Sequence, residues 1–170
     1  STSKAINEEQ LKKSGKNFSL LHCVSIYPTP VQFANLNRIN FLKTLSNSVG
    51  FSDHSKTEED GIKLSVASLL YNVDFIERHF TIIGKSETKD GVVSLNPNEL
   101  KKLVEMTKKN KNEILEYIKE NFTNHADSLG KEKRPLSHEE LLNRDYYRGR
   151  FASINSNGDY IYNWEEKEIN

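Results

Sequence analysis

The sequence predicts an α/β fold built on a parallel sheet, and three observations lead to this prediction. Apolar, strand-like runs begin near residues 18, 49 and 74. Each repeat therefore spans roughly 25 to 31 residues, the size of a β/α unit with a crossover helix. Helical patterns stand between the runs, and polar residues gather where the runs end. This arrangement is typical of a doubly wound sheet or of a (β/α)8 TIM barrel.

The first predicted elements are a short helix and a buried strand. Residues 7–13 read NEEQLKK and open with the capping pattern of a helix. The continuous apolar run FSLLHCV, at 18–24, is typical of a strand that is buried on both faces. A loop must follow, because Pro28 and Pro30 have no amide hydrogen to give to a sheet.

The next two units repeat the order of helix and then strand. Residues 35–46 place leucine and isoleucine on one helical face, and VGFSDHS at 49–55 reads as a short strand that runs into polar residues. Residues 61–72 form a mostly apolar helical pattern, and DFIERHFTII at 74–83 is the third strand.

The last clear pattern is a long amphipathic helix at 96–122. Asn96 is its expected N-cap and Pro97 its first residue, with Glu99 placed to complete a capping box.

The length of the chain favours part of a barrel over a whole one. A complete barrel needs about 250 residues and eight units, whereas this chain has 170 residues. We therefore expect residues 1–124 to be the C-terminal β/α units of a TIM barrel. Residues 125–170 would be a linker or tail that leads out of it. A small open sheet is the alternative.

The composition argues against several classes of protein. The 24 basic and 24 acidic residues cancel, and no stripe of lysine and arginine interleaves with aromatic residues, so we expect no nucleic-acid partner. No apolar run approaches the about 20 residues of a membrane span, and no signal-peptide pattern opens the chain. Cys23 is the single cysteine, which suits a reducing cytoplasm.

Several motifs occur along the chain in a specific order. They are LLHCVSIYPTP, NLNRINFLK, GFSDHS, IERHFT and SLNPNELKKLV. In that order they resemble the C-terminal half of the barrel in the sialic acid synthase (N-acetylneuraminate synthase) family, whose members condense phosphoenolpyruvate with N-acylated hexosamines. The likeness covers residues 1–122 and continues more faintly through KRPLSHEELLNRDYYRGRFAS.

The resemblance implies a divalent metal site made by His54 of SDH and His79 of ERHF. The ion is expected to be manganese, with magnesium as the alternative. Two imidazoles at neighbouring strand ends can hold one ion and leave positions open for water and for a substrate carbonyl. The metal would polarise the sugar aldehyde, carbon 3 of phosphoenolpyruvate would attack it, water would add at carbon 2, and phosphate would leave. The product would be a nonulosonic acid.

The resemblance also implies residues that bind the two substrates. Ser52 matches a serine that holds phosphoenolpyruvate, and Ser1 lies where another such serine stands in the family. Asp90 matches an aspartate that hydrogen-bonds the sugar, while Ser25 and Tyr27 lie in the loop that lines the sugar end of the pocket.

Other interpretations of the same segments remain open. His22 beside Cys23 is either a Cys/His nucleophile or a pair of buried strand residues. Asp53 can orient a backbone group or a ligand instead of touching metal. Glu77 and Arg78 can form a structural ion pair.

Two hypotheses for the function follow. In the first, the chain is the C-terminal part of a synthase, which works as a homodimer and needs a preceding barrel half. In the second, it is a non-catalytic half-barrel for association with another chain. The second is favoured by the absence from this chain of the lysines with which the family's first strands bind phosphoenolpyruvate.

Overall fold

The computed structural model describes residues 18–147, 152–154, 157–158 and 160–162. The predicted helix at 7–13 and the predicted site residue Ser1 lie outside these ranges. Within them, no helix is long and apolar enough to cross a membrane.

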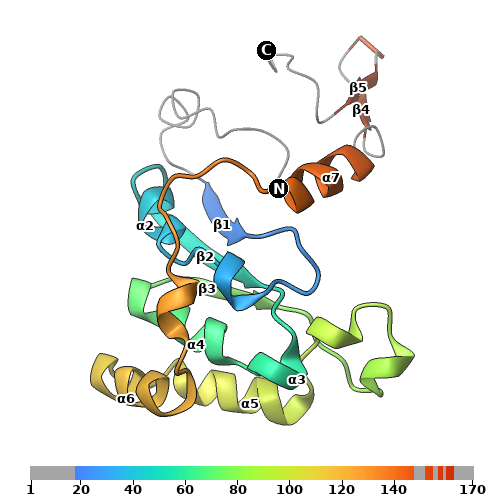
Figure 1. The fold of residues 1–170 in the computed structure, drawn as a ribbon. Coiled ribbons are helices and arrows are strands. Elements are labelled where there is room, and N and C mark those ends of the chain that lie inside the picture. Colours follow the sequence, from blue (N-terminus) through green and yellow to red (C-terminus); the bar gives the residue numbers. More distant parts are fainter. Residues whose placement is uncertain (1–17, 148–151, 155–156, 159, 163–170) are drawn as a thin grey trace.

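The centre of the described structure is a parallel sheet of three strands (Figure 1). The strands are β1 (Ser19–Cys23), β2 (Ser48–Asp53) and β3 (Phe75–Arg78), and they lie in the order β1-β2-β3. The predicted α/β fold with a parallel sheet is therefore confirmed, and all three strands occur where they were expected. All three point their carboxyl ends the same way, because both neighbouring pairs are parallel.

The third strand is shorter than predicted. The sequence predicts a strand at 74–83, but regular pairing with β2 ends at Arg78. Beyond it, Phe80 makes an isolated bridge with Leu95, and the Thr81 amide donates to the Leu95 carbonyl over 2.9 Å. The chain therefore leaves the sheet and enters a loop that returns on itself.

Short helices connect the strands. The first connection contains the 3-10 helix η1 (Val31–Phe33) and α2 (Arg38–Lys43). The second contains α3 (Thr57–Asp60) and α4 (Lys63–Ser68), and α4 continues as the 3-10 helix η2 (Leu69–Tyr71). The helical patterns predicted at 35–46 and 61–72 thus correspond to α2 and to α4 with η2.

The single helix predicted at 96–122 is wrong, because two helices occupy this range. These are α5 (Pro97–Met106) and α6 (Lys111–Asn121). Asn96 and Glu99 form the predicted capping box of α5, and Asn110 forms a second capping box that starts α6.

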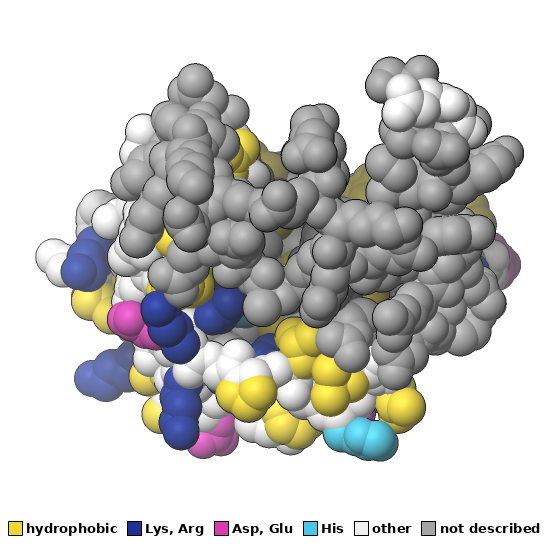
Figure 2. Space-filling model, turned by 90° about the horizontal axis from the view of Figure 1, so that it is seen from above, with side chains coloured by type: hydrophobic (Ala, Val, Ile, Leu, Met, Phe, Trp, Pro, Cys, Tyr) yellow, Lys and Arg dark blue, Asp and Glu magenta, His cyan; other side chains and the backbone are white. Residues whose placement is uncertain are grey.

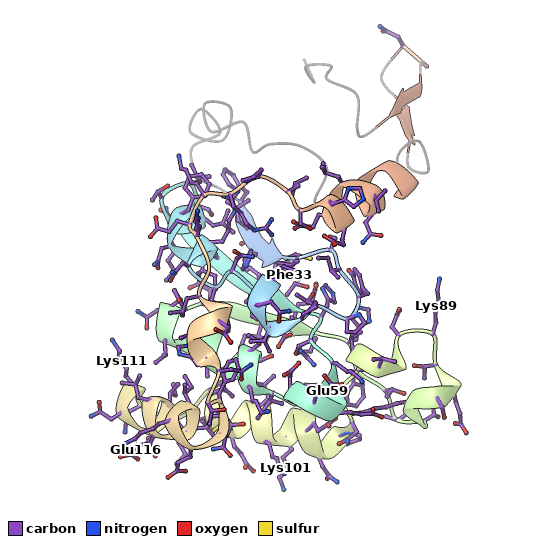
Figure 3. The ribbon with its side chains drawn as sticks, in the orientation of Figure 1. Phe33, Glu59, Lys89, Lys101, Lys111 and Glu116 are labelled. Carbon is purple, nitrogen blue, oxygen red and sulfur yellow. The ribbon has the colours of Figure 1, made fainter. Side chains whose placement is uncertain are left out.

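The second cap explains why the chain breaks there. The Asn110 side chain accepts from the Glu113 amide over 3.2 Å, and this competes with continuation of α5. The break lets α6 bury Ile114 and Ile118 in the core. The labelled Lys101, Lys111 and Glu116 point away from the sheet (Figure 3).

Residues after 124 form further structure. They contain the 3-10 helix η5 (His125–Ser128), α7 (His138–Tyr147) and an antiparallel pair, β4 (Ala152–Ile154) and β5 (Tyr160–Tyr162). The boundary at 124 between barrel and tail stays a prediction.

The two faces of the sheet differ, because alternate strand residues point to opposite sides. We call the side that packs on the helices the helix face. Val49, Phe51 and Ile76 lie there and join the main hydrophobic core with Leu42 and Leu64. We call the other side the opposite face. It carries Leu21, Cys23, Gly50, Ser52, Phe75 and Glu77.

The described part of the face seen from above mixes side chains of every kind (Figure 2). Seen from above, dark-blue lysine and arginine side chains stand among magenta acidic and yellow hydrophobic ones (Figure 2). This mixture reflects the equal numbers of basic and acidic residues in the sequence.

Candidate active site

Two histidines meet at the carboxyl ends of β2 and β3. His54 and His79 each come directly after the last residue of their strand, and the two strands are paired. The ring centres lie 5.2 Å apart with the ring planes at 59°. His54 is buried, with 5% of its surface exposed, whereas the His79 side chain is 35% exposed. The sequence prediction that these two residues converge is therefore supported by the geometry.

The loop that follows β1 brings Tyr27 to the same place. The Tyr27 ring centre lies 4.2 Å from that of His54 and 6.2 Å from that of His79. The end of the loop is held by Thr29, whose amide donates to the His54 carbonyl over 2.8 Å. The Thr29 hydroxyl donates to the Ile26 carbonyl over 2.6 Å. Tyr27 is half exposed, so its ring covers His54 while one side stays accessible.

Asp90 reaches the histidines from the loop after β3. Its Oδ2 lies 3.8 Å from Nδ1 of His79. The loop contains two 3-10 helices, η3 (Lys85–Glu87) and η4 (Gly91–Val93). A Cβ on Gly91 would lie 1.7 Å from the Lys85 carbonyl oxygen, so only glycine permits this close approach.

The loop that carries Asp90 is tied to the helices. Lys85 Nζ donates to the Thr57 hydroxyl over 2.6 Å and to Glu99 Oε1 over 3.2 Å. These contacts join the loop to α3 and to α5.

Ser52 lies on the same face as His54, two residues earlier on β2. Its hydroxyl donates to Glu77 Oε1 over 2.6 Å. Glu77 is its direct partner in the register of β2 and β3, and its side chain is exposed. Glu77 is therefore a member of the site that the sequence interpretation missed. Its position two residues before His79 was the available signal, because residues two apart on a strand share a face.

The alternative ion pair between Glu77 and Arg78 is wrong, because Arg78 binds Asp53 on the helix face. Arg78 Nη1 lies 2.6 Å from Asp53 Oδ2, and both side chains are almost fully buried. Asp53 also accepts from the Ser55 amide over 2.8 Å and from the Ser65 hydroxyl over 2.6 Å. Its carboxylate is thus fully engaged with protein groups, which supports a role in orienting the backbone beside His54.

The alternative Cys/His nucleophile is not supported either. His22 and Cys23 point to opposite faces of β1, and His22 Nε2 lies 2.6 Å from the Ala34 carbonyl oxygen. Burial lowers the pKa of His22 to about 4 and raises the pKa of the Cys23 thiol. Cys23 Sγ lies 3.9 Å from His54 Nδ1, but at neutral pH this thiol stays protonated and is a poor nucleophile.

The electrostatics of the site suit a metal ligand. Burial lowers the pKa of His54, and the nearby His79 lowers it further. His54 is therefore neutral at pH 7, which is the form that binds a metal. Bonds from imidazole nitrogen to a metal are about 2.1 Å long. Rings whose centres are 5.2 Å apart are close enough to share one ion.

His54 and His79 are the two candidate metal ligands that the described residues bring together. Among the described residues, no group of three or more His, Cys, Asp or Glu side chains is arranged to hold a metal. Two protein ligands leave the other coordination positions to water and substrate, as a Lewis acid requires.

Ser25 also lies in the loop after β1, near Cys23. Its carbonyl accepts a hydrogen bond from the Asn143 side chain of α7. Of the predicted site residues within the described ranges, Tyr27, His54, His79 and Asp90 thus form one cluster. Ser52 and Ser25 lie beside it.

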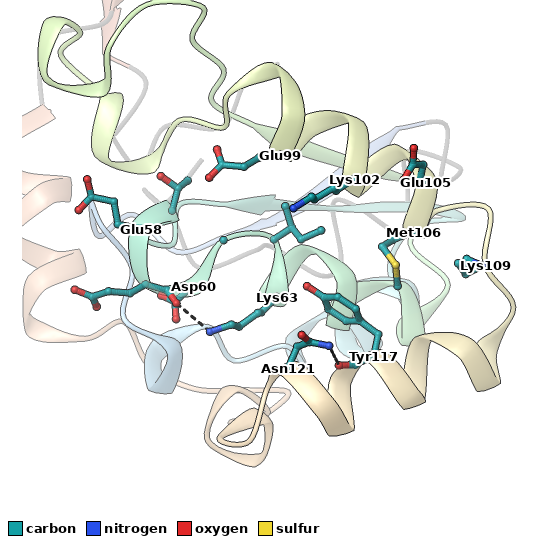
Figure 4. Close-up of a pocket in the computed structure, with 14 residues that line it drawn as sticks. Glu58, Asp60, Lys63, Glu99, Lys102, Glu105, Met106, Lys109, Tyr117 and Asn121 are labelled. Atoms are coloured by element: carbon teal, nitrogen blue, oxygen red, sulfur yellow. Dashed lines mark hydrogen bonds between the residues drawn. The ribbon is translucent and has the colours of Figure 1, made fainter.

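A separate groove of about 530 Å³ lies between α3 and α4 on one side and α5 and α6 on the other (Figure 4). Ile62, Met106 and Tyr117 line it together with acidic side chains and lysines. Lys63 donates to the Glu59 carbonyl over 2.9 Å within it. The groove shares no residue with the histidine cluster.

Comparison with known proteins supports the resemblance noted in the sequence. The NeuB family model matches residues 2–119. The chain belongs to the NeuB family of sialic acid synthases.

Relatives in this family are named as synthases. The chain is 33% identical over 162 residues to a pseudaminic acid synthase of Campylobacter jejuni. This alignment covers 90% of the chain and 41% of the relative. It is 37% identical over 98 residues to the N-acetylneuraminate-9-phosphate synthase of Drosophila melanogaster, covering 56% of the chain and 25% of the relative.

A solved structure shows the same fold. The crystal structure of the spore coat polysaccharide biosynthesis protein SpsE from Bacillus subtilis aligns with a TM-score of 0.63 and 26% identity. The alignment covers 89% of this chain and 44% of SpsE. The NeuB-family chain described here thus spans less than half the length of each of these relatives.

Proposed function

We propose that this chain supplies the metal-binding side of a sialic acid synthase active site. The reaction would be the condensation of phosphoenolpyruvate with an N-acylated hexosamine, which yields a nonulosonic acid and phosphate. The observation that supports this most is the convergence of His54 and His79 from neighbouring parallel strands, with ring centres 5.2 Å apart. Membership of a family whose relatives are named as synthases supports the same reaction.

In this proposal each residue of the cluster has one task. His54 and His79 hold a divalent ion, manganese or alternatively magnesium, which when bound polarises the sugar aldehyde. Ser52, with Ser1, holds phosphoenolpyruvate, and Asp90 accepts a hydrogen bond from a sugar hydroxyl. Tyr27 covers the sugar end of the pocket together with Ser25.

The rest of the active site would come from a preceding barrel half. The described strands would then be consecutive strands of a (β/α)8 barrel, and the opposite face of the sheet would line its interior. This assignment suits the exposure of Leu21, 38% exposed on that face. We also propose the homodimeric assembly and the cytoplasmic location that the family resemblance implies.

A phosphate-release assay tests the proposal. Phosphoenolpyruvate is offered with N-acetylmannosamine or with a diacetamido hexose, with and without manganese, to this chain and to this chain supplemented with a preceding barrel half. The assay compares two sugars because relatives of this chain are named for different products, pseudaminic acid and N-acetylneuraminate 9-phosphate. Release should need both sugar and metal.

Two histidine variants sharpen the assay. His54→Ala should reduce phosphate release at least about 100-fold, because it removes a direct metal ligand. The matched control is His138→Ala, which changes an exposed histidine at the start of α7. No release under any of these conditions would contradict the proposed function and favour a half-barrel that serves only for association.

A further inference from the structure

The segment after η5 is fastened to the connection between β1 and α2. The Leu36 amide donates to the Ser128 carbonyl and the Asn37 amide to the Leu129 carbonyl, each over 2.9 Å. The Arg38 side chain donates to the Glu132 carbonyl over 2.9 Å. The chain therefore does not leave the fold after η5 but runs back along the first β/α connection (Figure 1).

The start of α7 is held by a buried charge pair. Arg134 donates to both carboxylate oxygens of Glu140, over 2.5 and 2.9 Å, and Glu140 is 1% exposed. Glu140 also accepts from the Ser137 amide over 2.8 Å, which makes a capping box at the helix start. Burial alone would raise the pKa of Glu140, but the hydrogen bonds from Arg134 and Ser137 outweigh it and lower that pKa. These contacts fix the conformation of the first turn of α7, and Arg134 and Glu140 lie near enough to His22 of β1 to influence its pKa.

Asn143 connects α7 to the loop that follows β1. It lies three residues after Glu140, on the same side of the helix, and its side chain donates to the Ser25 carbonyl. Ser25 stands two residues before Tyr27, whose ring lies 4.2 Å from that of His54. Thr29 already holds the far end of the loop against His54. Asn143 therefore fastens the near end.

We propose that Asn143 is a positioning residue for the sugar-binding loop. By holding the Ser25 carbonyl it keeps Tyr27 over His54 and so favours binding of the hexosamine. The effect on the sugar depends on the function proposed above, whereas the position of the loop can be measured in the folded protein without any substrate.

Amide hydrogen exchange tests the loop directly. In Asn143→Ala, exchange at residues 25–27 should become about fivefold faster, as expected for the loss of one hydrogen bond, while exchange in β2 and β3 stays unchanged. Leu142→Ala is the matched control, because Leu142 is the neighbouring residue and is 56% exposed. Asn143→Gln, which keeps the amide donor, should restore part of the protection.

Kinetics give the second measurement. Asn143→Ala should raise the KM for the hexosamine about fivefold, with the KM for phosphoenolpyruvate unchanged and kcat within about twofold. Uniformly faster exchange throughout the chain would overturn the proposal, because α7 would then only stabilise the fold. Unchanged exchange at residues 25–27 would overturn it as well. Absence of turnover in the unmodified protein would count against the proposed function alone, since the exchange result is independent of it.

Discussion

Asp53 and Arg78 stand next to His54 and His79 in the sequence, yet the two pairs differ in almost every physical respect. Asp53 and Arg78 meet on the helix face at 2.6 Å, are almost fully buried and engage further protein groups. The histidines meet at the strand ends with ring centres 5.2 Å apart, and His79 is partly exposed. One step along each strand therefore separates residues that hold β2 to β3 from residues that are available to a ligand.

The largest expected effect comes from breaking the buried pair. Arg78→Met leaves the Asp53 carboxylate buried without its counter-charge, so the free energy of unfolding should fall by about 3–5 kcal/mol. Urea denaturation followed by circular dichroism measures this. Lys56→Ala, which removes an exposed ion pair with Glu59, is the control and should leave the midpoint unchanged. A midpoint for Arg78→Met equal to that of the unmodified chain would refute the assignment of this pair to stability.

The second effect concerns the histidines. His79→Ala should weaken manganese binding at least about 100-fold, equivalent to about 2.7 kcal/mol, because one of two protein ligands is lost. The same change should alter the free energy of unfolding by less than about 1 kcal/mol, since His79 is partly exposed. Titration calorimetry with manganese gives the affinity. Equal manganese binding by both proteins would exclude His79 as a ligand.

A smaller effect is expected from pH, through His22 on the helix face. The pKa of His22 is about 4 in the folded protein, whereas its ordinary value, taken for the unfolded chain, is 6.5. Between pH 4 and pH 6.5 the unfolded chain therefore binds a proton that the folded protein does not. Stability is therefore lost as pH falls from 6.5 towards 4, and the loss from this residue at pH 5 is about 2 kcal/mol.

Urea denaturation at pH 7 and pH 5 measures this effect. His22→Gln removes the titrating group, so its stability should fall about 2 kcal/mol less than that of the unmodified chain over this interval. Parallel losses in the two proteins would show that His22 is not the group responsible.

The strand ends of the candidate site could be predicted from the sequence, because the signals there are local. Apolar runs marked the strands, and parallel strands bring their carboxyl ends to one edge, so His54 and His79 were expected together. The family resemblance added Asp90 and Tyr27, which lie in loops that periodicity cannot place. The structure brings both to the histidines.

Three other features were not predicted from the sequence: the break between α5 and α6, the partner of Arg78 and the contact of Asn143 with Ser25. The break between α5 and α6 was missed because apolar spacing continues across it, although Asn110 and Glu113 carried a second capping signal. The sequence alone does not decide which carboxylate pairs with Arg78. Glu77 is adjacent in the sequence, but its side chain points to the other face of the sheet. Asn143 and Ser25 are 118 residues apart in the sequence, and a local sequence pattern cannot predict a contact over such a separation.

That long separation has a consequence for how the molecule is made. During synthesis β1 emerges well before residues 128–143, so the Leu36 amide and the Ser25 carbonyl must wait for their partners until the ribosome has added about a hundred further residues. The β1–α2 connection should therefore be the last part of the described sheet region to acquire its native contacts. An expression fragment that stops at residue 124 would contain the three described parallel strands and still leave this connection incomplete, whereas one that extends through Asn143 would supply its missing contacts.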